Sequence, residues 1–412
     1  MQIRIDVKKA FISPLAPFAA VVFLVSFSDS IMSYVTPLFL ENVTKNALIM
    51  GMILSASSVC GIFIDFIIAK FFGKRSYVFF MLWMIIFAAL FPFVLLTVPP
   101  NMVFILLSML VWSLYYELRG YSDFSFIHRF MPMGKHTLAC SVIATVVSLA
   151  YTLGPILAVF LIEKHFDFSF IASIITTGLS FVLFVMFFWK NKKRRNLPAT
   201  EHKEKTSFIK EIKVLGVLFQ KIKILLLFQF ALMLCDAAFW TTGILFANKL
   251  KEVNEIAAFI PSAYTLPSIF VGTLASLVKT PMGKKRGAFA SGVVGACAIS
   301  LIAFTQNVPI IIVLVLIAAV TMQLACIYIY STFTDYVERL DILGNDITTL
   351  TQLAANMAYI VGPIALGYIA VKINYGATFG FAGIFLLLVT FFAMTVTPRK
   401  IRMPQAELKA LK

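Results

Sequence analysis

Seven ionisable side chains stand out because they lie inside long apolar stretches of the sequence or at their edges. Six are carboxylic acids and one is an arginine: Asp29, Asp65, Glu117, Arg119, Asp123, Asp236 and Asp335. A charge held away from water is costly, so such groups usually face a cavity, pair with an opposite charge or bind a proton. The chemistry that they offer is therefore proton uptake and release, together with ion pairing to a charged solute.

Helical spacing predicts which polar residues share a face with Asp29 and with Asp236. Residues three or four positions apart lie on one side of a helix. Asp29 therefore belongs to a polar stripe with Ser33 and Thr36. By the same rule, Asp236 shares a face with Trp240, whose position in mid-helix favours a cavity wall over an interfacial anchor.

Around position 119, helical spacing places the two acids Glu117 and Asp123 on different sides of one helix. Tyr116, Arg119 and Asp123 share one face, whereas Glu117 points to the other side of the same helix. Arg119 has two interpretations. It binds an anionic substrate group or holds the proton-carrying carboxylate between cycles, or it pairs with Asp123 four residues on as a structural strut.

We expect Asp29 or Glu117 to carry the proton, because partial loss of water around a carboxyl group favours its neutral form. Asp65 is expected to cap a helix or brace a loop, and Asp335 to lie at a solvated helix end. Further candidates for the wall of a central cavity are Tyr328, Gln352 and Asn356.

The elements that hold these residues are predicted by composition. The 412 residues are 60% hydrophobic and only 13% charged, whereas soluble domains are about half apolar and about a quarter charged. Continuous apolar runs of about 20 residues predict helices that cross a bilayer, since membrane strands would alternate. Twelve runs qualify and predict an all-α integral membrane protein: 14–40, 47–71, 76–98, 102–127, 137–162, 168–190, 223–247, 256–279, 287–305, 309–335, 346–372 and 376–396.

Lysine and arginine are distributed unevenly between the connections. The side that holds both termini contains 29 of the 35 basic residues, and the opposite connections contain five. Basic loops stay in the cytoplasm, so both termini are expected there, in a multi-pass protein of the cell (inner or plasma) membrane. The longest connection, 190–222, is the expected linker between halves at 1–189 and 223–412. Within it, Ser207–Lys223 mixes apolar and basic residues like an amphipathic helix held by anionic lipid, with regulatory docking as the alternative.

The two groups of six spans match each other in order. Four pairs are separated by a nearly constant 207 to 212 residues: Asp29 with Asp236, Gly73-Lys74-Arg75 with Gly283-Lys284-Lys285-Arg286, Asp123 with Asp335, and Gly154-Pro155 with Gly362-Pro363. Because six is even, both halves begin on the same side of the membrane. The halves are therefore expected to be parallel, pseudo-symmetric repeats.

These features resemble the major facilitator superfamily over nearly the whole chain. The Gly-basic turn after the second span of each half resembles the end of the family's loop motif, although Lys70 stands where that motif has aspartate. Gly154-Pro155 resembles the helix-5 motif of drug–proton antiporters, with Ala158 where a further glycine is usual. The resemblance implies the family fold and a central cavity lined by helices 1, 4, 7 and 10. It also implies gating loops at Gly73, Lys74, Arg75, Gly283 and Lys284, and hinges at the two Gly-Pro pairs.

Several function classes are excluded or disfavoured. The net charge of +16 lies in short clusters between spans, which does not suit nucleic acid. No GxxxxGK[ST] motif is present to bind ATP. The five cysteines are dispersed and lack CxxC pairs, so neither a metal nor another cofactor is expected.

The function predicted first is secondary active transport by alternating access: proton-coupled efflux (antiport) of a small or amphipathic solute. The alternatives are proton-coupled uptake (symport) of a sugar or organic acid, a transporter-like receptor that does not transport, and a membrane-embedded transferase. The expected partners are a small-molecule substrate, protons and membrane lipids, and the chain is expected to act as a monomer.

Overall fold

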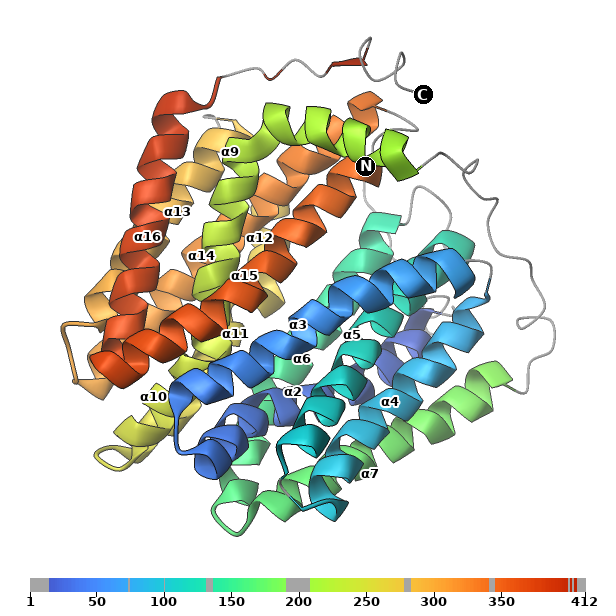
Figure 1. The fold of residues 1–412 in the computed structure, drawn as a ribbon, viewed down its shortest axis with the longest axis vertical. Coiled ribbons are helices and arrows are strands. Elements are labelled where there is room, and N and C mark those ends of the chain that lie inside the picture. Colours follow the sequence, from blue (N-terminus) through green and yellow to red (C-terminus); the bar gives the residue numbers. More distant parts are fainter. Residues whose placement is uncertain are drawn as a thin grey trace. The chain divides into compact units, whose positions relative to one another are not determined.

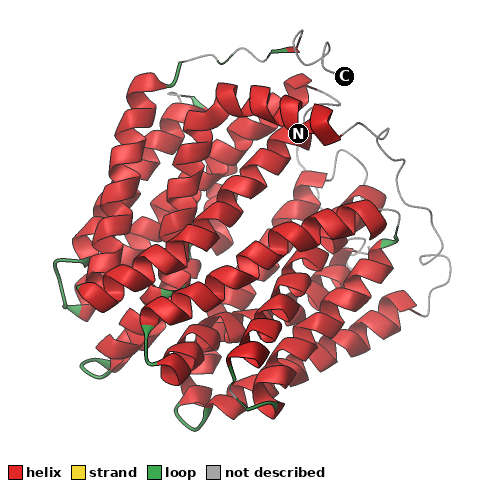
Figure 2. Ribbon diagram, in the orientation of Figure 1, coloured by secondary structure: helices red, strands yellow, loops and turns green. Residues whose placement is uncertain are grey.

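A computed structural model describes residues 15–72, 75–99, 101–130, 136–189, 208–277, 283–340, 345–398, 401 and 404–405. The described part is built of helices joined by short turns, and it contains no strand (Figure 2). This confirms the predicted all-α class. The elements are α2 (Leu15–Thr44), α3 (Ala47–Ile67), the π-helical turn η1 (Ile68–Phe72), α4 (Tyr77–Thr97), α5 (Met102–Phe130), α6 (His136–Ile162), α7 (Phe166–Phe184), the π-helical turn η3 (Val185–Trp189), α9 (Phe208–Trp240), α10 (Thr242–Lys251), the 3₁₀ turn η4 (Glu255–Phe259), α11 (Ile260–Thr265), α12 (Ser268–Leu277), α13 (Lys284–Ile302), α14 (Val308–Leu340), α15 (Asn345–Lys372) and α16 (Tyr375–Val396).

Twelve helical segments of the described residues are long and apolar enough to cross a membrane. Each corresponds to one predicted span, so the count of twelve is confirmed. Two of these segments are interrupted. Thr241 separates α9 from α10, and Pro267 follows α11, where its ring and missing N–H prevent the helix from continuing unbroken.

The seventh span begins earlier than its apolar run indicates. The predicted start was residue 223, but α9 is continuous from Phe208 to Trp240 (Figure 1). No proline interrupts this stretch, so the backbone hydrogen bonds of the amphipathic segment extend directly into the span. The segment is therefore helical and joined to the span, although its first turns run in a different direction from the later part of α9 (Figure 1).

The chain divides into two compact units. Unit 1 contains residues 1–39 and 63–200, and unit 2 contains residues 40–62 and 201–412. The first part of α3 thus belongs to unit 2, where it lies against α15. A Cβ at Gly51 would stand 2.0 Å from the carbonyl oxygen of Pro363, so only glycine permits this approach.

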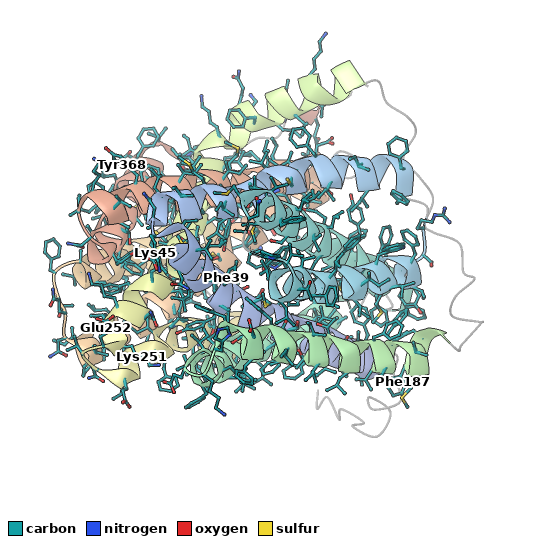
Figure 3. The ribbon with its side chains drawn as sticks, turned by 60° about the horizontal axis from the view of Figure 1, so that its bottom comes forward. Phe39, Lys45, Phe187, Lys251, Glu252 and Tyr368 are labelled. Carbon is teal, nitrogen blue, oxygen red and sulfur yellow. The ribbon has the colours of Figure 1, made fainter. Side chains whose placement is uncertain are left out.

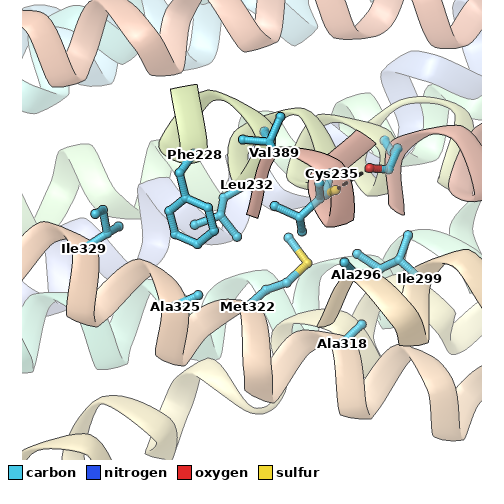
Figure 4. Packing of buried hydrophobic residues seen from close by; sticks show 14 of the residues in the cluster. Phe228, Leu232, Cys235, Ala296, Ile299, Ala318, Met322, Ala325, Ile329 and Val389 are labelled. Atoms are coloured by element: carbon cyan, nitrogen blue, oxygen red, sulfur yellow. Dashed lines mark hydrogen bonds between the residues drawn. The ribbon is translucent and has the colours of Figure 1, made fainter. Parts of the chain in front are cut away.

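The core of unit 2 lies where α9, α13, α14 and α16 meet (Figure 4). Small residues let these helices approach closely, as is usual in membranes. At Gly292 of α13, an added Cβ would stand 2.9 Å from the ring of Phe228. The side chains drawn in Figure 4 include Phe228, Leu232, Cys235, Ala296, Ile299, Met322 and Val389.

In unit 1, hydroxyl groups join α2 to α7. Ser28 donates to the Ser173 carbonyl at 3.0 Å, and Thr177 donates to the Ser28 hydroxyl at 2.8 Å. These bonds hold the middle of α2, which carries Asp29.

On the surface of the molecule, large aromatic side chains such as Phe187 and Tyr368 are exposed (Figure 3), as expected for side chains that face lipid.

Candidate functional site

Asp29 lies near the middle of α2 and is buried, with 4% of the residue exposed. Each of its carboxylate oxygens accepts a hydrogen bond from a different helix. Trp112 of α5 donates its indole N–H to Oδ1 at 2.9 Å. The hydroxyl of Tyr151 on α6 donates to Oδ2. Such donors stabilise an ionised carboxylate away from water, so unit 1 can hold Asp29 in its charged form.

Arg119 lies between two carboxylates. Its Nη1 is 3.9 Å from Oδ2 of Asp29, and its Nε is 4.0 Å from Oδ2 of Asp123. It donates a hydrogen bond to the Tyr115 hydroxyl at 3.1 Å. Oδ1 of Asp123 is buried and has no partner among the described residues. With both acids ionised, Asp29, Arg119 and Asp123 carry one net negative charge, which a single proton can neutralise.

Aromatic rings surround this trio. Trp112 stacks on Phe91 with ring centroids 4.8 Å apart, and the Tyr116 and Tyr151 hydroxyls are 3.4 Å apart. Ser33, the predicted neighbour of Asp29 on the polar stripe, lies close to Tyr116. A void of about 10 Å³ borders Asp29 and Trp112, which is about the space that one water molecule needs.

Gly154 explains how Tyr151 reaches Asp29. A Cβ at Gly154 would stand 1.8 Å from Oγ of Ser30, a distance that real atoms do not adopt. Ser30 also donates to the Ala150 carbonyl of α6 at 2.9 Å. Because α2 and α6 are in direct contact at this level, the tyrosine one turn before Gly154 meets the carboxylate. The Gly-Pro pair therefore serves close packing here.

Unit 2 contains a corresponding group around Asp236 of α9. The Tyr264 hydroxyl of α11 donates to Oδ1 at 2.7 Å, and the Tyr359 hydroxyl of α15 donates to Oδ2. No ion pair is recorded for Asp236 within the part of the chain that the structure describes. When ionised, this group therefore also carries one net negative charge.

The contact that positions Tyr359 repeats the arrangement of unit 1. Gly362 of α15 faces α9, and a Cβ there would stand 3.2 Å from Cβ of Ala237. Tyr359 precedes this glycine by one turn, as Tyr151 precedes Gly154. Each repeat thus uses a glycine on its fifth helix to bring a tyrosine to the aspartate of its first helix.

Tyr151 and Tyr264 were not among the candidates predicted from sequence. A signal for Tyr151 was present, because Ala150-Tyr151-x-x-Gly-Pro-Ile156 recurs as Ala358-Tyr359-x-x-Gly-Pro-Ile364, 208 residues later. The matched Gly-Pro pairs could have been extended by those flanking residues. No sequence signal of this kind points to Tyr264. The second donor in unit 1 is Trp112, and the two residues lie on different helices of the repeat, so alignment of the repeats does not pair them.

Glu117 does not lie with Asp29. It lies on the side of α5 where the charge of Asp65 acts on it, as the helical spacing predicted. Asp65 accepts a hydrogen bond from the Tyr121 hydroxyl at 2.8 Å. This contact ties α3 to α5 and agrees with a bracing role for Asp65.

The remaining cavity candidates lie in unit 2 but do not contact Asp236 in any recorded hydrogen bond. Trp240, Tyr328 and Asn356 are partly buried, and Gln352 is exposed. Buried Gln229, which shares the helix face of Asp236, instead donates to the Tyr330 hydroxyl at 3.2 Å and to the Thr351 carbonyl at 3.0 Å.

The predicted gating residues are only partly described. Gly73 and Lys74 lie outside the described residues, while the guanidinium of Arg75 is 5.5 Å from the centroid of the Phe79 ring. Gly283 has a φ of 80° and directly precedes α13 as its N-cap. Lys284 donates to Asp335 at 2.6 Å, so the predicted solvated end of α14 is an exposed ion pair.

Within the described residues, no cluster of three or more histidine, cysteine, aspartate or glutamate side chains is placed to bind a metal ion.

Comparison with known sequences identifies one family. A profile of the Major Facilitator Superfamily matches residues 124–342, which is more than half of the chain. No curated protein matches the sequence.

Solved structures with the same fold come from several transporters. A POT family transporter in complex with 5-aminolevulinic acid has a TM-score of 0.76 at 13% identity, covering 93% of this chain and 96% of that one. The human organic anion transporter MFSD10 (TETRAN) has a TM-score of 0.64 at 14% identity, covering 92% and 98%. A bacterial homologue of the human lysosomal transporter Spinster, inward-facing and occupied, has a TM-score of 0.70 at 11% identity, covering 96% and 99%. At these identities the likeness shows the fold.

Proposed function

This chain belongs to the Major Facilitator Superfamily, and from that premise we propose that it exports an amphipathic, positively charged solute in exchange for protons. Membership of the family makes it a multi-pass membrane transporter and not an enzyme. The alternative of a membrane-embedded transferase is thereby excluded. Coupling, direction and substrate belong to the proposal.

The observation that carries the proposal is one excess negative charge in the group around Asp29 in unit 1 and one in the group around Asp236 in unit 2. In unit 1 it belongs to Asp29, Arg119 and Asp123 together, and in unit 2 to Asp236 alone, which is bound by two tyrosine hydroxyls. A net charge away from water favours uptake of a positive charge. A proton or a cationic group of the substrate can supply it, and competition between the two couples their movements in opposite directions.

Arg119 supports Asp29 as the residue that exchanges the proton. If Asp29 is neutralised, the guanidinium still has Asp123 4.0 Å away, so it is not left unpaired. If Asp29 is charged, Trp112 and Tyr151 hold its two oxygens. No charge is therefore left unpaired whether Asp29 is neutral or ionised, as a residue that takes up and releases a proton requires.

A second candidate is proton-coupled uptake of an organic anion. It is favoured by Arg119, whose guanidinium is more than 3.8 Å from either carboxylate and is partly accessible, at 14% of its side chain. An anionic substrate could bind there once Asp29 is protonated. One structural neighbour is described as a human organic anion transporter, and another as a peptide transporter in complex with sulfate.

The test is flux in proteoliposomes under an imposed pH gradient, with a panel of amphipathic amines and organic acids. Addition of an amine should release protons from the protein-containing vesicles, as reported by a trapped pH-sensitive dye. Asp29→Asn should abolish this exchange, because it removes the negative charge for which the proton and the solute compete. Proton flux driven by organic acids alone would select the symport candidate. Binding of solute without any flux would refute transport and favour the receptor.

Orientation rests on the distribution of basic residues, and we propose that both termini and residues 190–207 are cytoplasmic. A thiol introduced by Asn196→Cys should react with an impermeant reagent only after the cells are opened. Lys45→Cys, on the opposite side, should react in intact cells. The reverse pattern would overturn the orientation.

A further inference from the structure

A basic cavity lies at one end of unit 2, away from Asp236 and unused by the proposed transport cycle. It has a volume of about 730 Å³ and opens between the start of α13, the end of α14 and the end of α16. Its charged lining residues are Lys284, Lys285, Arg286, Asp335 and Arg339. Four of these five carry a positive charge, so the cavity has an excess of cations.

Asp335, the acid in the cavity, is already paired with a lysine. Asp335 accepts from Lys284 at 2.6 Å, and Lys285 donates to the Pro398 carbonyl at 2.6 Å. Arg286 and Arg339 have no acidic partner among the described residues. Arg339 is also close enough to Lys285 for the two charges to repel each other. Such a group of cations is stabilised by an anion with several oxygen atoms.

The cavity wall is not uniformly polar. Phe289, Tyr336 and Ile401 contribute buried apolar surface. The hydroxyl of Thr397, which lines the same cavity, is buried and has no hydrogen-bond partner within the described residues. An amphiphile with an anionic head matches this mixture better than a small inorganic ion does, because it would cover the apolar wall and satisfy the cations together.

Next to the cavity, α16 exposes a row of apolar side chains. Met394, which lines the cavity, is 43% exposed, and Phe391 and Leu388, at successive three-residue steps before it, are 52% and 64% exposed. A hydrocarbon chain could lie along this row while the head occupies the cavity. The proposed orientation places this end of unit 2 at the cytoplasmic leaflet, where anionic lipids concentrate and attract basic residues.

We propose that this cavity binds the phosphate group of an anionic phospholipid, with Arg286 and Arg339 as its principal ligands. The phosphate ester is the recognised chemistry, and a soluble phosphate compound is its other possible source. The proposal does not depend on which solute the protein transports.

The experiment is native mass spectrometry of the purified full-length protein with phosphatidylglycerol, phosphatidylcholine and glycerol 3-phosphate. Wild-type protein should retain one phosphatidylglycerol in preference to phosphatidylcholine, because the zwitterionic head lacks the net charge. Arg286→Gln with Arg339→Gln should weaken that binding roughly 30-fold, since each basic residue near the membrane surface contributes about a five-fold gain in affinity. The matched control is Lys249→Gln with Lys251→Gln, which removes two charges from α10 of the same unit and should leave binding unchanged.

Each result decides the proposal. Equal binding of the two lipids, or equal weakening by the control pair, would overturn it, because either result indicates general attraction to lipid. Glycerol 3-phosphate that displaces the lipid at equal concentration would keep the phosphate site and assign it to soluble compounds. A melting profile like that of wild type establishes that the double variant is folded, so that loss of lipid reports the site.

Discussion

Asp29 and Asp236 occupy matching places in the two repeats, yet different side chains surround them. Both accept a hydrogen bond from a tyrosine that lies one turn before a Gly-Pro pair. Asp29 adds an indole and an arginine that is shared with Asp123, whereas Asp236 adds a second tyrosine. The net charge is nevertheless the same in both groups. Both repeats thus keep one excess negative charge and one tyrosine donor to the aspartate, whereas the other side chains that contact the aspartate differ.

The largest difference should appear when Arg119 is removed. Arg119→Gln leaves two buried carboxylates without a cation, and breaking a buried ion pair costs about 3–5 kcal/mol. We expect the unfolding free energy in mixed micelles, measured by denaturant titration, to fall by about that amount. Asp123→Asn in the same chain should restore much of the loss, because the trio again lacks only one proton. No rescue would mean that Arg119 acts through packing and not through charge.

The shared tyrosines offer the next comparison. Tyr359→Phe removes one of the two donors recorded for Asp236, while Tyr151→Phe leaves Asp29 with Trp112 and the nearby Arg119. A hydrogen bond to a charged group contributes about 1.5–3 kcal/mol. Without that donor the ionised form of Asp236 is less stable, so a proton competes better with a cationic solute. At fixed pH, Tyr359→Phe should therefore lower the apparent affinity for the solute by roughly ten-fold or more, and Tyr151→Phe should lower it less. Equal losses in equilibrium binding would show that the arginine does not distinguish the two groups.

The glycines of the two Gly-Pro pairs should also respond unequally. An added Cβ meets Ser30 at 1.8 Å in Gly154→Ala but meets Ala237 at 3.2 Å in Gly362→Ala. Overpacking of this kind typically costs about 1–3 kcal/mol. Thermal denaturation in detergent should show a clear loss for Gly154→Ala and a smaller one for Gly362→Ala. The opposite order would contradict the packing described for α2 and α6.

The smallest effect is expected at the exposed acid of unit 2. Lys284→Gln breaks the pair with Asp335, whose side chains are 43% and 38% exposed. Exposed ion pairs contribute about 0–1 kcal/mol. Denaturant titration should place this variant within about 1 kcal/mol of wild type. A loss of stability as large as that of Arg119→Gln would mean that burial does not determine how much an ion pair contributes.

The twelve spans and the separation of Glu117 from Arg119 could be predicted from sequence because length, hydropathy and helical periodicity determine them. The pairing of Asp29 with Arg119 could not be derived in this way, since it depends on how α2 and α5 pack. Helical spacing suggested Asp123 as the partner of Arg119, and the structure adds Asp29 on the other side.

The sequence predicts an amphipathic helix and a span as two elements, whereas the structure joins them in one helix, α9. Lys210, Lys213 and Lys221 lower the hydropathy of residues 208–222, but the backbone of a helix can continue through polar residues. Hydropathy marks the part of a helix that suits the bilayer interior and does not mark where the helix begins.

The single excess charge of each group sets a limit on how steep a gradient the protein could build. One proton neutralises each group, so a cycle that used one group would exchange one proton for each singly charged solute. That exchange moves no net charge across the membrane and supports a roughly ten-fold concentration ratio for every unit of pH difference. A cycle that used both groups would exchange two protons and support roughly a 100-fold ratio. It would also move one net charge, so the membrane voltage would become a second driving force.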